Sequence, residues 1–65
     1  MRIVLNGKAR EVREARLDAL LEELGYAGAK VATAVNGDFI ARNLRERTRL
    51  NDGDRVEVIA PMQGG

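Results

Sequence analysis

The residues best suited to covalent chemistry are the last three, Gln63, Gly64 and Gly65. Glycine has no side chain, so two successive glycines make a thin segment that a narrow channel can admit. A terminal carboxylate has a reference pKa of about 3.3–3.7 and is therefore ionised at neutral pH. Such an anion can attack the α-phosphate of ATP, and the resulting acyl adenylate can then react with a sulfur nucleophile. We therefore expect Gly65 to present an activatable carboxylate, which Gly64 and Gln63 thread into a partner's site.

A frayed chain end is the ordinary alternative for the same residues. Terminal residues are commonly disordered, and a Gly-Gly pair is too short a motif to be specific by itself. The last expected strand ends near Ala60. At roughly 3.3–3.6 Å per extended residue, residues 61–65 can reach about 17 Å from the body of the domain. The sequence pattern of the remaining residues is therefore needed to distinguish a frayed end from a functional tail.

The composition excludes most other kinds of chemistry. The 65 residues include no His, no Cys, one Phe and one Tyr, and the net charge is +1. Histidine-based triads, disulfides and nearly every zinc site need residues that this sequence lacks, so we expect no catalytic residue and no metal. The near-neutral charge and few aromatic residues disfavour nucleic-acid binding. No stretch approaches the ~20 apolar residues of a membrane span and no secretion leader is recognisable, so we expect a cytoplasmic protein.

Two short strands are expected first. In residues 1–5, Met1, Ile3 and Leu5 alternate with Arg2, which suits a half-buried strand. Asn6-Gly7 supplies the positive φ angles of a two-residue hairpin turn. Residues 8–13 are predicted to return antiparallel, although Val12 is their only strong β-former.

One helix follows the hairpin. Four leucines at positions i, i+3, i+4 and i+7 predict an amphipathic helix over residues 17–24. Gly25 suits a left-handed C-terminal cap, whereas Arg16 is a poor N-cap. The leucines that form the apolar face are Leu17, Leu20, Leu21 and Leu24.

Three further strands are expected in the second half. Residues 31–35 form the first, Asn36-Gly37 gives a second tight turn, and residues 39–41 form a brief strand. Residues 42–49 make a charged connector whose single expected anchor is Leu44. Residues 55–60 alternate again, which places Val56 and Val58 on one face and Glu57 and Ile59 on the other.

The order strand, strand, helix, strand, strand, strand predicts an α+β fold with one main helix across a mixed sheet of four to five strands. We expect a single domain over residues 1–65, with a body at 1–60 and a flexible tail at 61–65. We also expect the isolated chain to be a monomer. The arginines of the connector are expected to form a solvated loop rather than a docking surface; they are Arg42, Arg45, Arg47 and Arg49.

This order, combined with a Gly-Gly carboxyl terminus, resembles the ubiquitin-like β-grasp proteins, and within them the ThiS family of sulfur carriers. The resemblance runs from end to end. It departs from the family pattern at Arg16, where Thr or Val is common, and at Ala41, where Pro is common. The segments that carry it are Met1–Gly7, Leu17–Leu21, Val35–Asp38 with Arg42, Leu50–Val58 and Ala60–Gly65.

The resemblance implies a carrier that is acted on by partner enzymes. A ThiF-type adenylating enzyme would activate the Gly65 carboxylate with ATP and Mg²⁺. A persulfide from a cysteine desulfurase or a rhodanese-like donor would convert it to a thiocarboxylate, and thiazole synthase (ThiG) would take the sulfur for thiamin synthesis. The carrier itself would bind no cofactor and catalyse no reaction.

Partner enzymes must also bind the body of such a carrier. Ile59 lies just upstream of the tail on the face opposite the core, and we predict that it forms a docking patch with Met62 and Phe39. The competing interpretation assigns Phe39 to the core and treats Ile59 as an incidental exposed residue, which is common on protein surfaces.

Three other functions stay open from the sequence. A sister sulfur carrier, for molybdopterin synthesis or tRNA thiolation, shares every physical argument given above. A ubiquitin-like modifier would be joined through Gly65 to substrate lysines. A plain interaction module would function without its terminal glycines.

Overall fold

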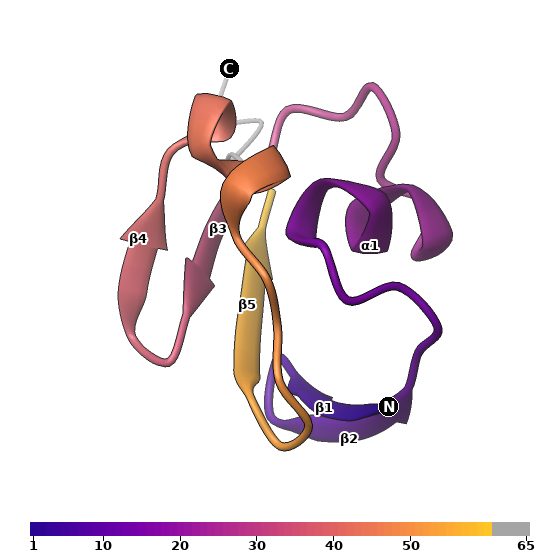
Figure 1. The fold of residues 1–65 in the computed structure, drawn as a ribbon. Helices are drawn as coiled ribbons and strands as arrows, with labels where there is room; N and C mark the ends of the chain where they lie inside the picture. Colours follow the sequence, from indigo (N-terminus) through magenta and orange to yellow (C-terminus); the bar gives the residue numbers. More distant parts are fainter. Residues whose placement is uncertain (61–65) are drawn as a thin grey trace.

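Five strands form one mixed sheet in the computed structural model, which describes residues 1–60. Their spatial order is β2-β1-β5-β3-β4, so the last strand lies at the centre between two hairpins (Figure 1). β5 pairs parallel with β1 and antiparallel with β3. The strand number, the mixed pairing and the single main helix confirm the predicted α+β arrangement. The strands are β1 (Arg2–Leu5), β2 (Lys8–Glu11), β3 (Ala32–Val35), β4 (Asp38–Ile40) and β5 (Arg55–Ile59).

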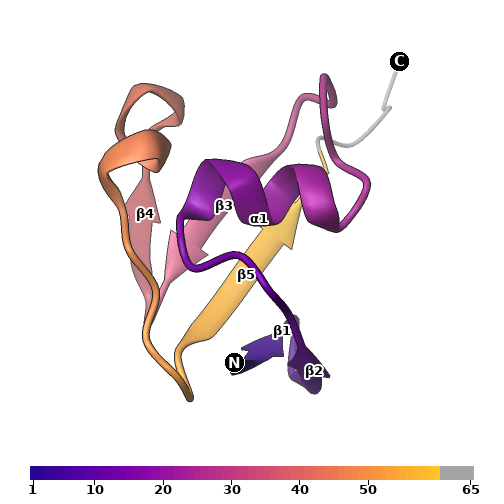
Figure 2. The same cartoon turned by 45° about the vertical axis from the view of Figure 1, so that its right-hand side comes forward.

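The helix α1 (Leu17–Glu23) crosses one face of the sheet (Figure 2). Three of its four leucines are buried, and the fourth, Leu24, is the C-cap rather than the last helical residue. Gly25 follows with a φ of +91°, as its position predicted. Among the described residues no side chain caps the N-terminus, and the backbone N–H of Leu17 instead donates to the carbonyl of Thr48 at 2.9 Å. Within residues 1–60, no helix has the length and apolar character needed to cross a membrane.

The core lies between α1 and the inner face of the sheet. Val56 and Val58 are buried while Ile59 is exposed, which confirms the alternation predicted for the last strand. Leu50, which the sequence analysis assigned to no strand or helix, also belongs to the core. The buried apolar side chains are Ile3, Val12, Leu17, Leu20, Leu21, Leu50, Val56 and Val58.

The charged connector is a 3₁₀ helix, η1 (Arg42–Arg47). The prediction that Leu44 anchors it is wrong, because Leu44 is 46% exposed while Arg45 is only 9% exposed. The Nε atom of Arg45 donates to the Thr33 hydroxyl at 3.1 Å, and Nη2 donates to the Val31 carbonyl at 2.6 Å. The expectation of a fully solvated loop is therefore also wrong at Arg45. Two hydrogen bonds on the guanidinium make its burial possible, because they replace bonds to water.

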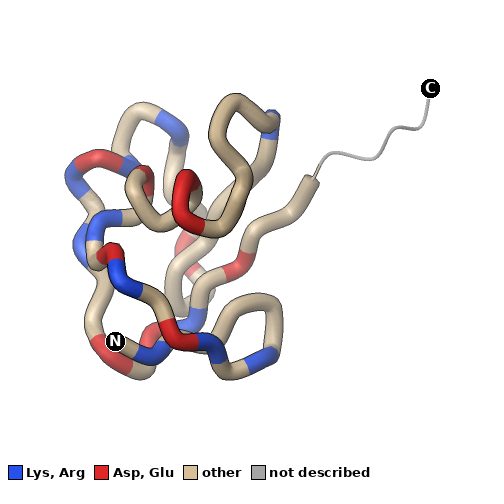
Figure 3. Tube along the Cα trace, turned by 90° about the vertical axis from the view of Figure 1, so that its right-hand side faces the viewer, with Lys and Arg blue, Asp and Glu red and all other residues tan. Residues whose placement is uncertain are grey.

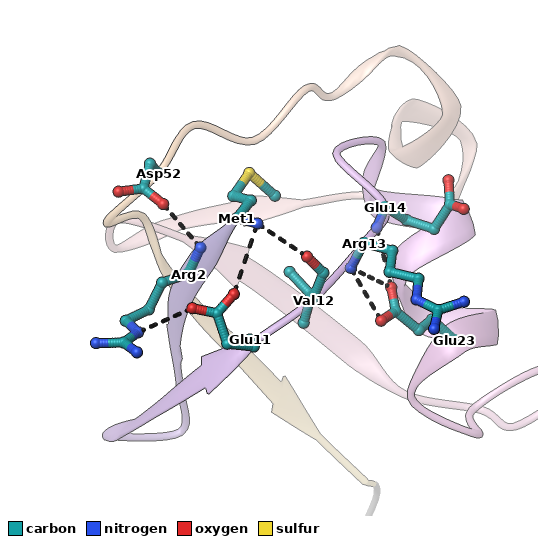
Figure 4. Close-up of polar contacts among 8 residues, drawn as sticks. All are labelled: Met1, Arg2, Glu11, Val12, Arg13, Glu14, Glu23 and Asp52. Carbon is teal, nitrogen blue, oxygen red and sulfur yellow. Dashed lines mark hydrogen bonds and ion pairs between the residues drawn. The ribbon is translucent and has the colours of Figure 1, made fainter.

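A carboxylate on the helix holds the connection between β2 and α1 (Figure 4). The Glu23 carboxylate accepts hydrogen bonds from the backbone N–H groups of Arg13 and Glu14 at 3.0–3.1 Å. These bonds favour the charged form and hold the pKa of Glu23 below its usual range. The Glu23 side chain therefore stabilises the folded state only while its carboxyl group is ionised.

Replacing Glu23 with Gln should make the stability of the domain less sensitive to acid. Because the pKa is lower in the folded state, the contribution of Glu23 is present at neutral pH and is lost as the pH falls below about 4. The Glu23→Gln variant should thus be less stable than the wild type at neutral pH, and the difference should shrink towards pH 3. Urea unfolding at several pH values measures it. Glu22→Gln, on the adjacent exposed residue, is the control, and an equal pH dependence in both variants would contradict this role.

Candidate functional site

The residues predicted to carry the chemistry lie outside the part of the chain that the structure describes. Met62, Gln63, Gly64 and Gly65 all lie outside residues 1–60. The structure instead defines the base from which they leave, because β5 ends at Ile59. The candidate site is therefore built from the strand that positions this base and from the surface around it.

Two asparagine side chains fix β5, one near each end. The Oδ1 atom of Asn6 accepts the backbone N–H of Val58 at 2.9 Å, and its Nδ2 donates to the carbonyl of the same residue at 3.2 Å. At the other end, the Oδ1 atom of Asn36 accepts the N–H of Arg55 at 2.9 Å, and its Nδ2 donates to Asp54 Oδ1 at 3.1 Å. Both neighbouring hairpins thus hold β5, and the bonds from Asn6 lie at the end of the strand from which the tail continues.

Each asparagine also begins the tight turn that the sequence predicted. Asn6 has a φ of +48° and Asn36 a φ of +51°, and the glycine that follows each also has a positive φ. This confirms both Asn-Gly turns. The sequence analysis missed the second role of these residues, which is to pair with β5. The sequence did contain a hint of this role, because both turns begin with Asn although glycine would suffice for the positive φ.

Asn6→Gly should separate the two roles, because glycine keeps the positive φ but removes both bonds to Val58. We expect the free energy of unfolding to fall by about 1–2 kcal/mol, since two part-buried backbone groups lose their partners. The protection of the Val58 amide against hydrogen exchange should fall as well. Asn36→Gly is the matched variant, and its loss should be smaller because its bonds are exposed. Unchanged protection of Val58 in Asn6→Gly would refute the pairing role.

Ile59 and Phe39 are exposed on the outer face of the sheet, opposite α1. Ile59 is 59% exposed and Phe39 is 71% exposed, so the interpretation that placed Phe39 in the core is wrong. The pairing register sets Ala32 opposite Ile59 and Ala34 opposite Phe39. Paired residues share a face, so two small side chains lie between the two large ones. Glu57 also lies on this face, opposite Ala34, so the described part of the predicted patch combines apolar side chains with one carboxylate. Its third member, Met62, lies outside the described residues.

A groove adjoins the base of the tail. It has a volume of about 470 Å³ and lies where the start of β3, the start of η1 and the end of β5 meet. Apolar side chains form its walls, and cationic side chains border it. The lining residues are Ala29, Lys30, Val31, Ala32, Arg42, Arg45 and Ile59.

The described residues offer little direct chemistry. Among residues 1–60, no group of three or more His, Cys, Asp and Glu side chains is placed to hold a metal. The charges of both signs are interspersed along the Cα trace, which agrees with the small net charge (Figure 3). The arrangement suits a body that presents a tail beside an apolar docking surface.

The chain resembles characterised proteins over its whole length. The ThiS family model matches residues 3–65. A sulfur carrier protein ThiS from Thermus thermophilus is 42% identical over 62 residues, which cover 94% of this chain and 95% of that protein. A thiazole synthase from Paramagnetospirillum magneticum is 35% identical over 66 residues, which cover 100% of this chain. The chain spans only 20% of the length of that synthase.

Solved structures give the same result for the fold. The crystal structure of a thiamine biosynthesis protein (ThiS) from Geobacter metallireducens superposes with a TM-score of 0.83 at 35% identity, covering 100% of both chains. The solution structure of a thiamine biosynthesis protein from the same organism gives 0.81 at 33% identity, covering 100% of this chain and 88% of the other. These matches confirm the predicted β-grasp fold.

Proposed function

Because this chain belongs to the ThiS family, and so is a sulfur carrier for thiamine biosynthesis, we propose that the Gly65 carboxylate is the group that carries the sulfur. The family match that extends through residue 65 is the observation that carries this proposal. The structure supports it because β5, the central strand of the sheet, ends at Ile59, close to the residues that would carry the chemistry. Gly64 and Gln63 then thread the carboxylate into partner sites.

The chemistry proceeds in three steps that partner enzymes catalyse. The Gly65 carboxylate attacks the α-phosphorus of ATP, bound with Mg²⁺ on a ThiF-type enzyme, and pyrophosphate leaves. The terminal sulfur of a protein persulfide then attacks the acyl carbon, so a C–S bond forms and AMP leaves. A thiol finally reduces the S–S bond, which releases the thiocarboxylate and leaves a disulfide behind. The carrier is a substrate throughout, and neither ATP nor Mg²⁺ binds to its body.

Thiazole synthase is the proposed acceptor of the sulfur. The support is that a protein named thiazole synthase contains a segment similar to the whole of this chain, although the chain spans only 20% of its length. A carrier and its acceptor in one polypeptide are held at a high effective concentration, which favours partners that act in succession. The sister carriers for molybdopterin synthesis and tRNA thiolation have no such observation in their favour.

The outer-face patch is the proposed surface through which the adenylating enzyme binds the body. Ile59→Asp should weaken this affinity at least about tenfold, because a carboxylate would be desolvated in an apolar contact. Leu44→Asp is the matched control, since Leu44 is also an exposed apolar residue but lies on η1. Calorimetric titration of both variants measures the effect. An unchanged affinity of Ile59→Asp would remove Ile59 from the patch.

Intact-protein mass spectrometry tests the function directly. The purified chain is incubated with a ThiF-type enzyme, a cysteine desulfurase, ATP, Mg²⁺, cysteine and a thiol reductant. The expected result is a mass gain equal to the replacement of one oxygen by one sulfur, which disappears when ATP is omitted. An unchanged mass, with enzymes that are active on a known carrier, would contradict the sulfur-carrier function. A covalent ladder on other proteins would instead indicate a modifier.

A further inference from the structure

Arg45 is a buried cation that has no carboxylate partner among residues 1–60. Its residue is 9% exposed, and the ion pairs of the described chain involve the N-terminus, Arg2 and Arg16 instead. Buried charges in proteins are ordinarily paired with an opposite charge. Its bonds to the neutral Thr33 hydroxyl and the Val31 carbonyl satisfy two nitrogens but do not neutralise the guanidinium.

The third nitrogen of this guanidinium, Nη1, has no hydrogen-bond acceptor among residues 1–60. Nε and Nη2 use the two bonds described above, and no described residue accepts a bond from Nη1. Every buried side-chain nitrogen or oxygen in the described chain does have a partner. Arg45 lines the groove at the base of the tail, so its accessible part faces that groove.

The groove combines this cation with an apolar wall. Val31, Ala32 and Ile59 supply the wall, and Lys30 and Arg42 add two more cationic side chains. No Asp or Glu is among the described residues that line it. A complementary ligand must therefore carry both an anionic group and an apolar group.

We propose that this groove binds an extended segment of thiazole synthase in which a carboxylate side chain adjoins an apolar side chain. The carboxylate accepts from Nη1 of Arg45, and the apolar side chain packs between Val31 and Ile59. Lys30 and Arg42 attract the segment during approach. Ile59 lies two residues before the tail, so a segment bound in this groove would hold thiazole synthase close to the start of the tail that delivers the sulfur. The choice of partner rests on the proposed function.

The test is the affinity of the chain for purified thiazole synthase, measured by calorimetry at low and at physiological salt. Arg45→Met removes the charge while keeping much of the side-chain length, and it should weaken binding at least about tenfold. Arg42→Glu and Lys30→Glu should each weaken it about threefold or more, with the larger effect at low salt. Arg47→Glu is the control, because it makes the same charge change on η1 but outside the groove. After the effect of the altered net charge is subtracted, its affinity for the synthase should stay within about twofold of the wild-type affinity.

Two outcomes would overturn the proposal. One is an affinity of Arg42→Glu and Lys30→Glu no weaker than that of Arg47→Glu. The other is an unchanged affinity of a folded Arg45→Met chain. The two rim variants decide the matter if Arg45→Met fails to fold, because Lys30 and Arg42 are both exposed.

The Nε–H resonance of Arg45 identifies the occupant. It should shift when thiazole synthase is added and should not shift with acetate alone at matched ionic strength. An equal shift with acetate would indicate a simple anion site, and a shift on truncation after residue 60 would indicate that the chain's own tail occupies the groove. Either result would refute the proposal. The gain of sulfur by the wild-type chain is measured in a separate assay without thiazole synthase. If the chain gains no sulfur there, that result counts against the proposed function and not against the groove.

Discussion

Removing Gly65 should abolish the gain of sulfur by the chain. The deletion leaves a carboxylate at Gly64, but that group stops one residue short, which is about 3.3–3.6 Å in an extended tail. Displacement of a reacting group by only ~1 Å can cost about a hundredfold in rate. A carboxylate several ångströms from the α-phosphate should therefore not be adenylated at a detectable rate.

The measurement is the mass assay with the same enzymes and substrates. Gly65→Ala is the matched variant, because it keeps the reach of the tail and adds only a methyl group. It should gain sulfur more slowly than the wild type, whereas the shortened chain should gain none. The urea midpoints of both variants should equal that of the wild type, which would exclude a folding defect. Full sulfur gain by the shortened chain would show that the position of the carboxylate is not decisive.

Leu20→Ala should have the largest effect on folding. Leu20 is completely buried where α1 meets the sheet. Truncating such a side chain removes apolar contacts and leaves a cavity, at a cost of about 2–5 kcal/mol. A single small core without disulfide or metal rarely supplies more than about 3–5 kcal/mol. The variant should thus be largely unfolded at room temperature.

Leu44→Ala is the matched control for this substitution. Leu44 is 46% exposed on η1, so the same loss of atoms should change the free energy of unfolding by no more than about 0.5 kcal/mol. Far-UV circular dichroism during urea unfolding follows both variants, because the chain has no Trp. Equal losses in the two variants would contradict the burial pattern and would restore Leu44 as an anchor of the connector.

Local patterns were sufficient to predict most of the architecture. The leucine spacing gave α1 to within one residue, because an amphipathic period is a property of consecutive positions. Both Asn-Gly turns were predicted correctly, since positive φ is a local demand that few residues meet. The alternation in β5 correctly separated the buried Val58 from the exposed Ile59.

Features that depend on distant contacts were missed. Arg45 reads as one more solvated arginine, because its burial requires two acceptors from a distant segment, the Thr33 hydroxyl on β3 and the Val31 carbonyl just before that strand. The pairing of Asn6 with Val58 joins residues 52 positions apart, which no local window contains. The groove likewise depends on three segments that meet only in the folded chain. The chemistry of the tail was predictable from the Gly-Gly motif, but no local sequence pattern identifies the partner enzymes.

The central position of β5 has a consequence for the synthesis of the chain on the ribosome. β1 and β3 each pair with β5 and not with each other, and β5 follows both in the sequence. The two hairpins therefore emerge first as separate pieces, and an isolated two-stranded hairpin is marginally stable at best in water. The sheet closes only after translation has passed Ile59. Products of interrupted translation that lack β5 consequently have no assembled body, and they cannot compete with the finished carrier for its enzymes.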